Sequence, residues 1–167
     1  MRRIRNPLAL PDQVLTRTWK KIRGHVTADP LKLARFEGPF HALMRVAIAL
    51  TFISHGTMKH LGFPAIVPGE GPPAFPPLLS LAGIAGILEL AGGAMVLFGL
   101  MVRPVAFLLS DMMAVAYWMV HAPNGFAPAI NGGEAAYLYC FLFLFLAAAG
   151  AGPYSIDAAR AGAKSEL

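Results

Sequence analysis

The sequence predicts an all-α integral membrane protein in which a four-helix bundle follows a basic amphipathic N-terminal segment. Of the 167 residues, 56% are hydrophobic and only 14% are charged, whereas a soluble domain carries about 25% charged residues. The apolar residues also gather into long segments, each close to the ~20 residues that cross a bilayer. We expect four spans, near residues 41–61, 78–100, 104–122 and 134–151.

The basic residues indicate the orientation of these spans. Most of them precede the first span: Arg2, Arg3, Arg5, Arg17, Lys20, Lys21, Arg23, Lys32 and Arg35. Because positive charge gathers on the cytoplasmic side of membrane proteins, four spans put both termini in the cytoplasm, here of a bacterial inner membrane. Charge confined to one end is not the footprint of a nucleic-acid-binding fold. We therefore expect membrane lipids and no nucleic acid among the partners.

The chain is expected to have three parts: a cytoplasmic leader over residues 1–38, a membrane domain over 39–157 and a cytoplasmic tail over 158–167. In the leader, Asp12 can cap a helix whose apolar side includes Trp19. A basic amphipathic helix of this kind lies on an anionic membrane surface. A disordered basic tail explains the same composition equally well.

Each of the first three spans carries an ionisable residue within the membrane: Arg45, Glu89 and Asp111. An ionised carboxylate at that depth costs ~2.5–3.5 kcal/mol or more, and small residues around Glu89 predict close helix packing on its face. Counting ~1.5 Å per residue places both carboxylates within reach of Arg45. We therefore expect an intramembrane charge cluster of these three residues. The alternative is that Arg45 extends to the headgroups.

A second polar layer is expected near the outer surface. His55 and Lys59 lie near the end of the first span, His121 ends the third and Glu134 begins the fourth. Two loops rich in Pro and Gly would roof a pocket between these residues, and their aromatic side chains suit a lipid-like or quinone ring. The alternative is that Lys59 and Glu134 form only a rim ion pair, worth ~0–1 kcal/mol.

Other kinds of site are disfavoured. The single cysteine, Cys140, lies in an apolar segment, so we expect no internal disulfide and no metal site. The glycines of the second span lie inside a helix and cannot cradle a phosphate. Haem ligation by His55 and His121 is conceivable, but lone histidines near helix ends are more often packing residues.

Several short motifs follow one another along the chain. In order they are Arg45 with F-x-x-x-G-x-x-K (Phe52, Gly56, Lys59), E-L-A-G-G with Gly99 and Arg103, N-G-G-E (Asn131 to Glu134), and G-x-G-P-x-S-I-D (Gly150, Gly152, Ser155, Asp157). Over Leu43 to Asp157 the chain therefore resembles the DoxX family of small four-helix membrane proteins. The resemblance implies a membrane subunit of oxidoreductase systems: quinone-linked thiosulfate oxidation in some members, thiol or oxidative-stress complexes in others.

Three classes of function remain for comparison, because family membership does not fix function. In the first, the chain is the membrane subunit of an oxidoreductase, linked to quinone or to thiol and sulfur oxidation through soluble or membrane redox partners. In the second, it is a structural or anchoring subunit whose charges fix helix packing. In the third, it is a small proton-linked transporter, for which four spans are few unless the protein is a homo-oligomer. The sequence does not decide whether the chain is catalytic alone.

Overall fold

The computed structural model describes residues 32–64 and 75–165, and the chain divides into two compact units, residues 1–37 and 38–167. Within the described residues all regular structure is helical, which confirms the predicted all-α class. The helices are η1 (Leu33–Phe36), α2 (Glu37–Leu61), α3 (Leu81–Phe98), α4 (Val102–Ala116), the π-helical turn η2 (Tyr117–His121), η3 (Ala122–Asn124), α5 (Pro128–Asn131), α6 (Glu134–Ala149) and α7 (Ile156–Ser165).

Three helical stretches are long and apolar enough to cross a membrane: Leu33–Leu61, Leu81–Phe98 and Val102–Asn124. The fourth predicted span corresponds to α6, which has 16 residues. At ~1.5 Å per residue it is about 24 Å long, against a hydrocarbon core of about 30 Å. The structure therefore supports three spans, and the fourth stays a prediction.

The ends of the helices differ from the predicted bounds. Helix α2 begins at Glu37 rather than near residue 41, because Pro39 falls in its first turn, where the missing N–H costs no hydrogen bond. Helix α7 occupies most of the segment predicted as a tail. The predicted amphipathic helix of the leader lies in residues 1–31, outside the described residues, as does part of the first loop, residues 65–74.

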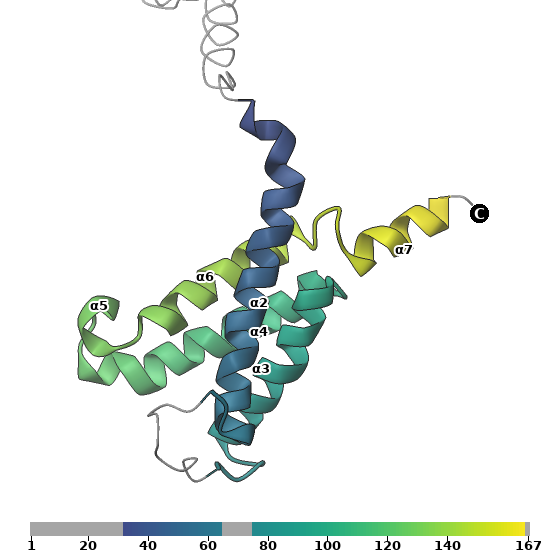
Figure 1. The fold of residues 1–167 in the computed structure, drawn as a ribbon. Helices are drawn as coiled ribbons and strands as arrows, with labels where there is room; N and C mark the ends of the chain where they lie inside the picture. The colour runs from purple at the N-terminus through teal and green to yellow at the C-terminus, as the bar shows by residue number, and fades with distance from the viewer. Residues whose placement is uncertain (1–31, 65–74, 166–167) are drawn as a thin grey trace, which may run out of the picture. The chain divides into compact units, whose positions relative to one another are not determined.

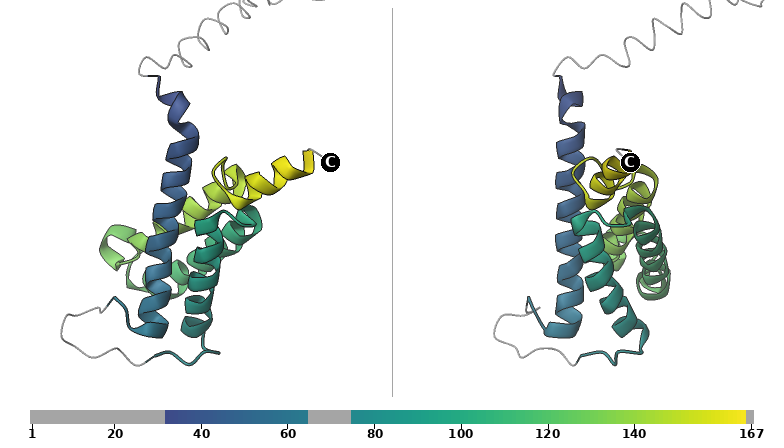
Figure 2. Two further views of the ribbon diagram at one scale, coloured as in Figure 1. Left: turned by 45° about the vertical axis from the view of Figure 1, so that its right-hand side comes forward. Right: turned by 90° about the vertical axis from the view of Figure 1, so that its right-hand side faces the viewer.

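Helices α2 and α3 lie side by side and antiparallel (Figure 2). Glycines permit the close approach: a Cβ added to Gly56 would lie 2.7 Å from Leu90 Cγ, and one added to Gly93 would lie 2.7 Å from Ile53 Cγ1. Small residues at a helix contact allow the backbones to meet closely in a membrane. The contact therefore fixes the register between the two helices.

Helices α4 and α6 also lie side by side, inclined to α2 (Figure 1). Ser110 on α4 donates a hydrogen bond to the carbonyl oxygen of Cys140 on α6, at 2.8 Å. The buried Phe52 of α2 joins this pair, since its ring meets that of Phe143 edge to face with centroids 4.7 Å apart. The core therefore lies where α2, α4 and α6 meet.

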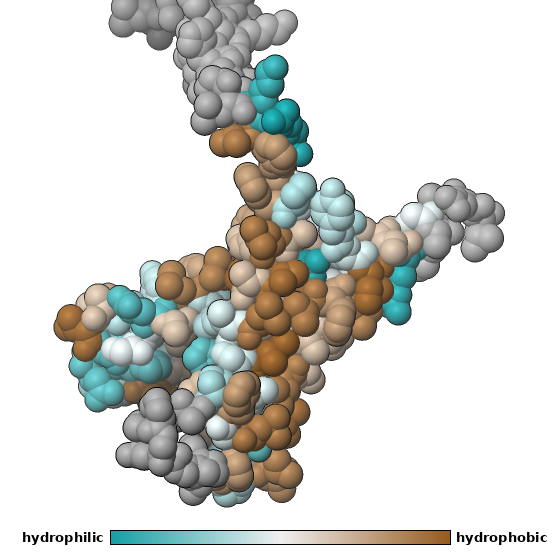
Figure 3. Space-filling model, viewed as in Figure 1, coloured by the Kyte–Doolittle hydropathy of each residue, from teal (hydrophilic) through white to brown (hydrophobic). Residues whose placement is uncertain are grey.

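The outer surface of the helices is rich in apolar side chains. Among the most exposed are Leu43, Leu81 and Phe107, each more than half exposed. Figure 3 shows apolar residues over much of the visible helical surface, while polar residues gather around α5. A membrane protein presents such a surface to lipid, because apolar side chains that face hydrocarbon are not in contact with water.

Candidate functional site

The candidate site is centred on an ion pair between α2 and α3. Lys59 Nζ lies 2.5 Å from Glu89 Oε1, and the Glu89 side chain is 3% exposed against 34% for Lys59. Helix α3 places Glu89 on the face that carries its buried glycines and packs against α2. Pairing with the ammonium group reduces the cost of burying the carboxylate among apolar helices.

The second oxygen of Glu89 is unpartnered, and the residue lines a cavity. Oε2 is buried and has no hydrogen-bond partner among the described residues. The cavity has a volume of about 150 Å³ and is lined by Phe52, His55, Lys59, Glu89, Met113, Ala116, His121, Ala135, Ala136 and Tyr139. An unsatisfied buried acceptor costs about 1–3 kcal/mol. A molecule in this cavity that donates a hydrogen bond to Oε2 would recover that cost.

Two histidines line the same cavity from opposite helices. The His55 ring meets the Tyr139 ring edge to face, with centroids 5.8 Å apart. His121 ends the π-helical turn that continues α4, and its Nδ1 lies 3.4 Å from the carbonyl oxygen of Asn131. Turns of π-helix often occur at functional sites, because the extra residue redirects a side chain.

A larger groove adjoins the cavity between α3 and α4. Its volume is about 520 Å³, and its lining is apolar apart from Lys59 and His121. The groove and the cavity share Lys59, Ala116 and His121. A polar cavity, which could bind the polar head of a ligand, therefore lies next to an apolar groove, which could hold its apolar tail.

The structure brings together three of the four residues predicted for the outer pocket: His55, Lys59 and His121 line the cavity. Glu134 does not join them, because it is exposed in the first turn of α6. The rim ion pair between Lys59 and Glu134 considered above is therefore wrong, since Lys59 is paired with Glu89. The flexible stem of Lys59 reaches inward to the buried carboxylate, where the attraction is stronger than at the surface.

The predicted cluster of Arg45, Glu89 and Asp111 does not form. The Arg45 guanidinium donates to the carbonyl oxygens of Val96 at 2.6 Å and Leu97 at 2.5 Å, at the C-terminus of α3. A third hydrogen bond of 2.7 Å reaches the carbonyl oxygen of Tyr154. The last carbonyls of a helix lack partners within it and carry partial negative charge, so they attract a cation without any carboxylate.

Asp111 lies on the outer side of α4 and is exposed. Its neighbour Ser110 points into the bundle instead, so a difference of one position along the helix decides between the core and the surface. The cluster was predicted from the depth of each residue in the membrane. That depth does not determine the direction in which a side chain points from its helix.

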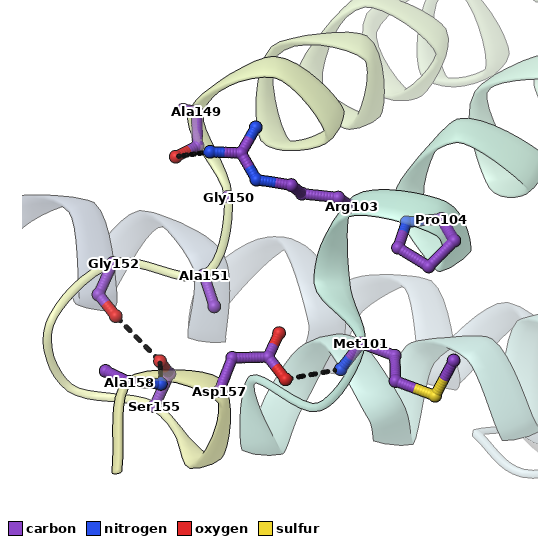
Figure 4. Close-up of a pocket in the computed structure, with 10 residues that line it drawn as sticks. All are labelled: Met101, Arg103, Pro104, Ala149, Gly150, Ala151, Gly152, Ser155, Asp157 and Ala158. Carbon is purple, nitrogen blue, oxygen red and sulfur yellow. Dashed lines mark hydrogen bonds between the residues drawn. The ribbon is translucent and has the colours of Figure 1, made fainter. Parts of the chain in front are cut away.

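Two further charges, Arg103 and Asp157, cap helix ends (Figure 4). Arg103 donates to the carbonyl oxygens at the end of α6, in the stretch Ala147 to Ala149. The Asp157 carboxylate accepts the backbone N–H groups of Met101 at 2.8 Å and Val102 at 3.0 Å, at the start of α4. Each charge thus has the sign that its helix end favours.

Arg45, Arg103 and Asp157 together are called the helix-cap cluster below. Arg103 and Asp157 line a surface pocket of about 410 Å³. Every charge in the cluster binds backbone groups that would otherwise lack partners, which gives it a structural role. The motif glycines Gly99 and Gly150 are the C-caps of α3 and α6 and have positive φ, 69° and 87°, which favours glycine. A Cβ at either position would also lie 3.2 Å from Arg45 or Arg103 respectively.

Sequence reasoning missed the pairing of Lys59 with Glu89, although a signal existed. In an antiparallel helix pair, facing residues run in opposite directions, so the glycine contact of Gly56 with Leu90 places Lys59, one turn later, beside the turn of α3 that holds Glu89. The same register carries Arg45 to the far end of α3. Tyr139, which the sequence did not single out for the site, also lines the cavity.

The family model for DoxX matches residues 40–122 of this chain. This match starts in α2, ends just after the π-helical turn and contains Arg45, Lys59, Glu89 and His121. The chain belongs to the DoxX family. A protein of Haemophilus influenzae described as uncharacterized is 40% identical over 111 residues, which cover 64% of this chain and 80% of that protein. No solved structure matches this DoxX chain.

The site of this DoxX protein combines charged, polar and apolar groups. It offers an ammonium group, a buried carboxylate with one unused oxygen, and two imidazoles around a ring-sized space. The described residues hold no group of three or more His, Cys, Asp or Glu side chains that could bind a metal ion.

Proposed function

We propose that this DoxX protein is the membrane subunit of an oxidoreductase system and binds a quinone, exchanging electrons through partner subunits. The observation that carries the proposal is the adjacency of the polar cavity and the apolar groove, which share Lys59 and His121. A cavity of about 150 Å³ is the size that accommodates a benzene ring. The groove would hold the apolar tail of the same molecule.

The donors around the cavity suit the oxygens of such a ring. The Lys59 ammonium and the His55 imidazole can each donate a hydrogen bond. The open side of the groove lies among exposed apolar residues of α3 and α4, so a lipid-soluble molecule would enter from the membrane rather than from water. This route suits a bacterial inner membrane, where quinones dissolve.

Binding tests the proposal directly. The full chain in lipid nanodiscs is titrated with a benzoquinone that carries a ten-carbon tail, and with the same ring without a tail. A ligand that binds the folded state raises the midpoint of thermal unfolding. We expect a rise for the tailed quinone, a smaller rise for the tailless ring, and loss of both in the Lys59→Met, His121→Ala double variant. No rise with either compound would refute quinone binding.

A second candidate function is that of an anchoring subunit, favoured by the helix-cap cluster, in which all three charges serve helix packing. Purification in mild detergent separates the two. Co-purification of a redox-active subunit together with quinone binding supports the oxidoreductase role, whereas a partner retained without quinone binding supports anchoring alone.

A further inference from the structure

We propose that the cavity selects the reduced form of the ring, a quinol, because Glu89 accepts a hydrogen bond from one of its hydroxyl groups. This proposal rests on the proposed function, since it concerns the ligand of the same cavity. It adds the oxidation state of the ligand and the atom that recognises it.

Glu89 lines the cavity as the carboxylate of an ion pair. Its Oε1 is paired with the Lys59 ammonium at 2.5 Å, and its side chain is 3% exposed. An ionised carboxylate can only accept hydrogen bonds. The atom of a ligand that meets Glu89 must therefore be a donor.

The other oxygen of the same carboxylate, Oε2, decides which form of the ring is preferred. Oε2 has no partner among the described residues, and Glu89 lines the cavity. A quinone presents only carbonyl oxygens, whose lone pairs would face those of Oε2. A quinol presents an O–H group of the same size at the same place. The two forms have nearly equal volume, so hydrogen bonding and not shape discriminates between them.

The tautomer of His121 favours the same form of the ring. Its Nδ1 lies 3.4 Å from the Asn131 carbonyl oxygen, which can only accept, so the contact favours the tautomer with hydrogen on Nδ1. In a neutral imidazole this leaves Nε2 as an acceptor. A second acceptor therefore lines the cavity, which again favours a ligand that brings its own hydrogens.

Water is the rival occupant. At a liquid share of about 30 Å³ per molecule, a cavity of this size would hold about five waters, and one of them could donate to Oε2. A water-filled cavity would show no preference between the two forms of the ring. The preference itself is therefore the discriminating measurement.

The experiment compares the tailed benzoquinone with its quinol, kept reduced under anaerobic conditions, on the full chain in nanodiscs. A hydrogen bond to a charged acceptor contributes enough for the quinol to bind at least tenfold more tightly than the quinone. In Glu89→Gln the amide can turn its NH₂ group to a carbonyl oxygen, so the preference should fall to threefold or less. Asp111→Asn, an exposed carboxylate outside both cavities, is the matched control and should keep the full preference.

The outcomes separate the two proposals. Equal binding of both forms, or tighter binding of the quinone, would overturn the quinol inference and leave quinone binding intact. An unchanged preference in a folded Glu89→Gln protein would also overturn it. Binding of neither form would refute the proposed function, and with it this inference.

Discussion

The two ends of the helical bundle use their charges in different ways. At one end Arg45, Arg103 and Asp157 bind backbone groups of helix termini, so that each charge has several partners. At the other end the Lys59 and Glu89 pair leaves one carboxylate oxygen without a partner beside a cavity. Arg45 Nε also has no partner among the described residues, so an incomplete bond alone does not separate the two ends. The difference teaches that a buried charge serves packing where it binds the ends of helices, and is a candidate for function where the unpartnered residue also lines a cavity.

The largest effect on stability is expected at the helix-cap cluster. Arg45→Leu would leave the carbonyl oxygens of Val96, Leu97 and Tyr154 without their donor. Each buried carbonyl oxygen left without a donor costs about 1–3 kcal/mol, so the folded yield and the midpoint of thermal unfolding in detergent should fall sharply. Arg160→Leu, on the exposed side of α7, should change neither. Equal stability of the two variants would show that the Arg45 bonds contribute little.

The second effect tests the contact between α2 and α3. A Cβ at Gly86 would collide with the His60 imidazole and meet Lys59 Cβ at 3.3 Å. Overpacking of this kind costs about 1–3 kcal/mol, and Gly86→Ala should also displace Lys59 and so reduce ligand binding. Gly162→Ala in α7 is the control, since its Cβ would meet nothing within 4 Å. There we expect unchanged binding and a gain of about 0.5–1 kcal/mol from helix propensity.

A moderate effect is expected from Asp157→Ala. This change removes the acceptor of the N–H groups of Met101 and Val102 at the start of α4. Loss of a helix cap costs about 0.5–2 kcal/mol, measured by thermal unfolding in detergent. Asp157→Asn should recover part of the loss, because its amide oxygen still accepts. If Asn and Ala variants were equally unstable, the negative charge would matter more than the hydrogen bonds.

At the cavity end, substitution of a charge should affect ligand binding more than stability. Glu89→Gln keeps the volume of the side chain and frees an ammonium group that is one-third exposed, so we expect a loss of stability no larger than about 1 kcal/mol. Quinol binding should nevertheless fall at least tenfold, for the reason given above. A stability loss as large as that of Arg45→Leu would place Glu89 with the structural charges.

The smallest effect on the protein is expected from single cysteine substitutions, which test the side of the membrane that each end of the bundle faces. Phe126→Cys and Arg160→Cys, each in a Cys140→Ser background, place single thiols at exposed positions of the cavity end and of α7. The predicted orientation has the cavity end outside, so a membrane-impermeant thiol reagent added to intact cells should label only the former. Labelling of the α7 thiol alone would reverse the orientation while leaving the comparison of the two ends intact.

How much the sequence could predict follows from the same comparison. The helices of the four apolar segments were predicted to within a few residues, because long apolar segments bounded by Pro and Gly leave few alternatives. Helices α5 and α7 were not predicted. The convergence of His55, Lys59 and His121 on one cavity agrees with their common depth, and their role stays a prediction. The partners of Arg45 and Glu89 were wrong because depth along a helix was used without the rotation of the helix and without its terminal carbonyls. Glu134 was misplaced for the same reason.

The shortness of α6 has a consequence for the membrane around it. If α6 crosses the bilayer, its ~24 Å must be matched to ~30 Å of hydrocarbon by local thinning or by immersion of the segment before it. That segment can tolerate immersion: the Asn131 side chain donates to the carbonyl oxygen of Gly125 at 2.6 Å and accepts the N–H of Gly133 at 2.8 Å, and Tyr117 donates to the carbonyl oxygen of Phe126 at 2.5 Å. Local thinning of the bilayer would instead bring the aqueous boundary closer to the cavity. The protein would then favour thin bilayers, and vesicles of increasing acyl-chain length should progressively weaken its thermal stability.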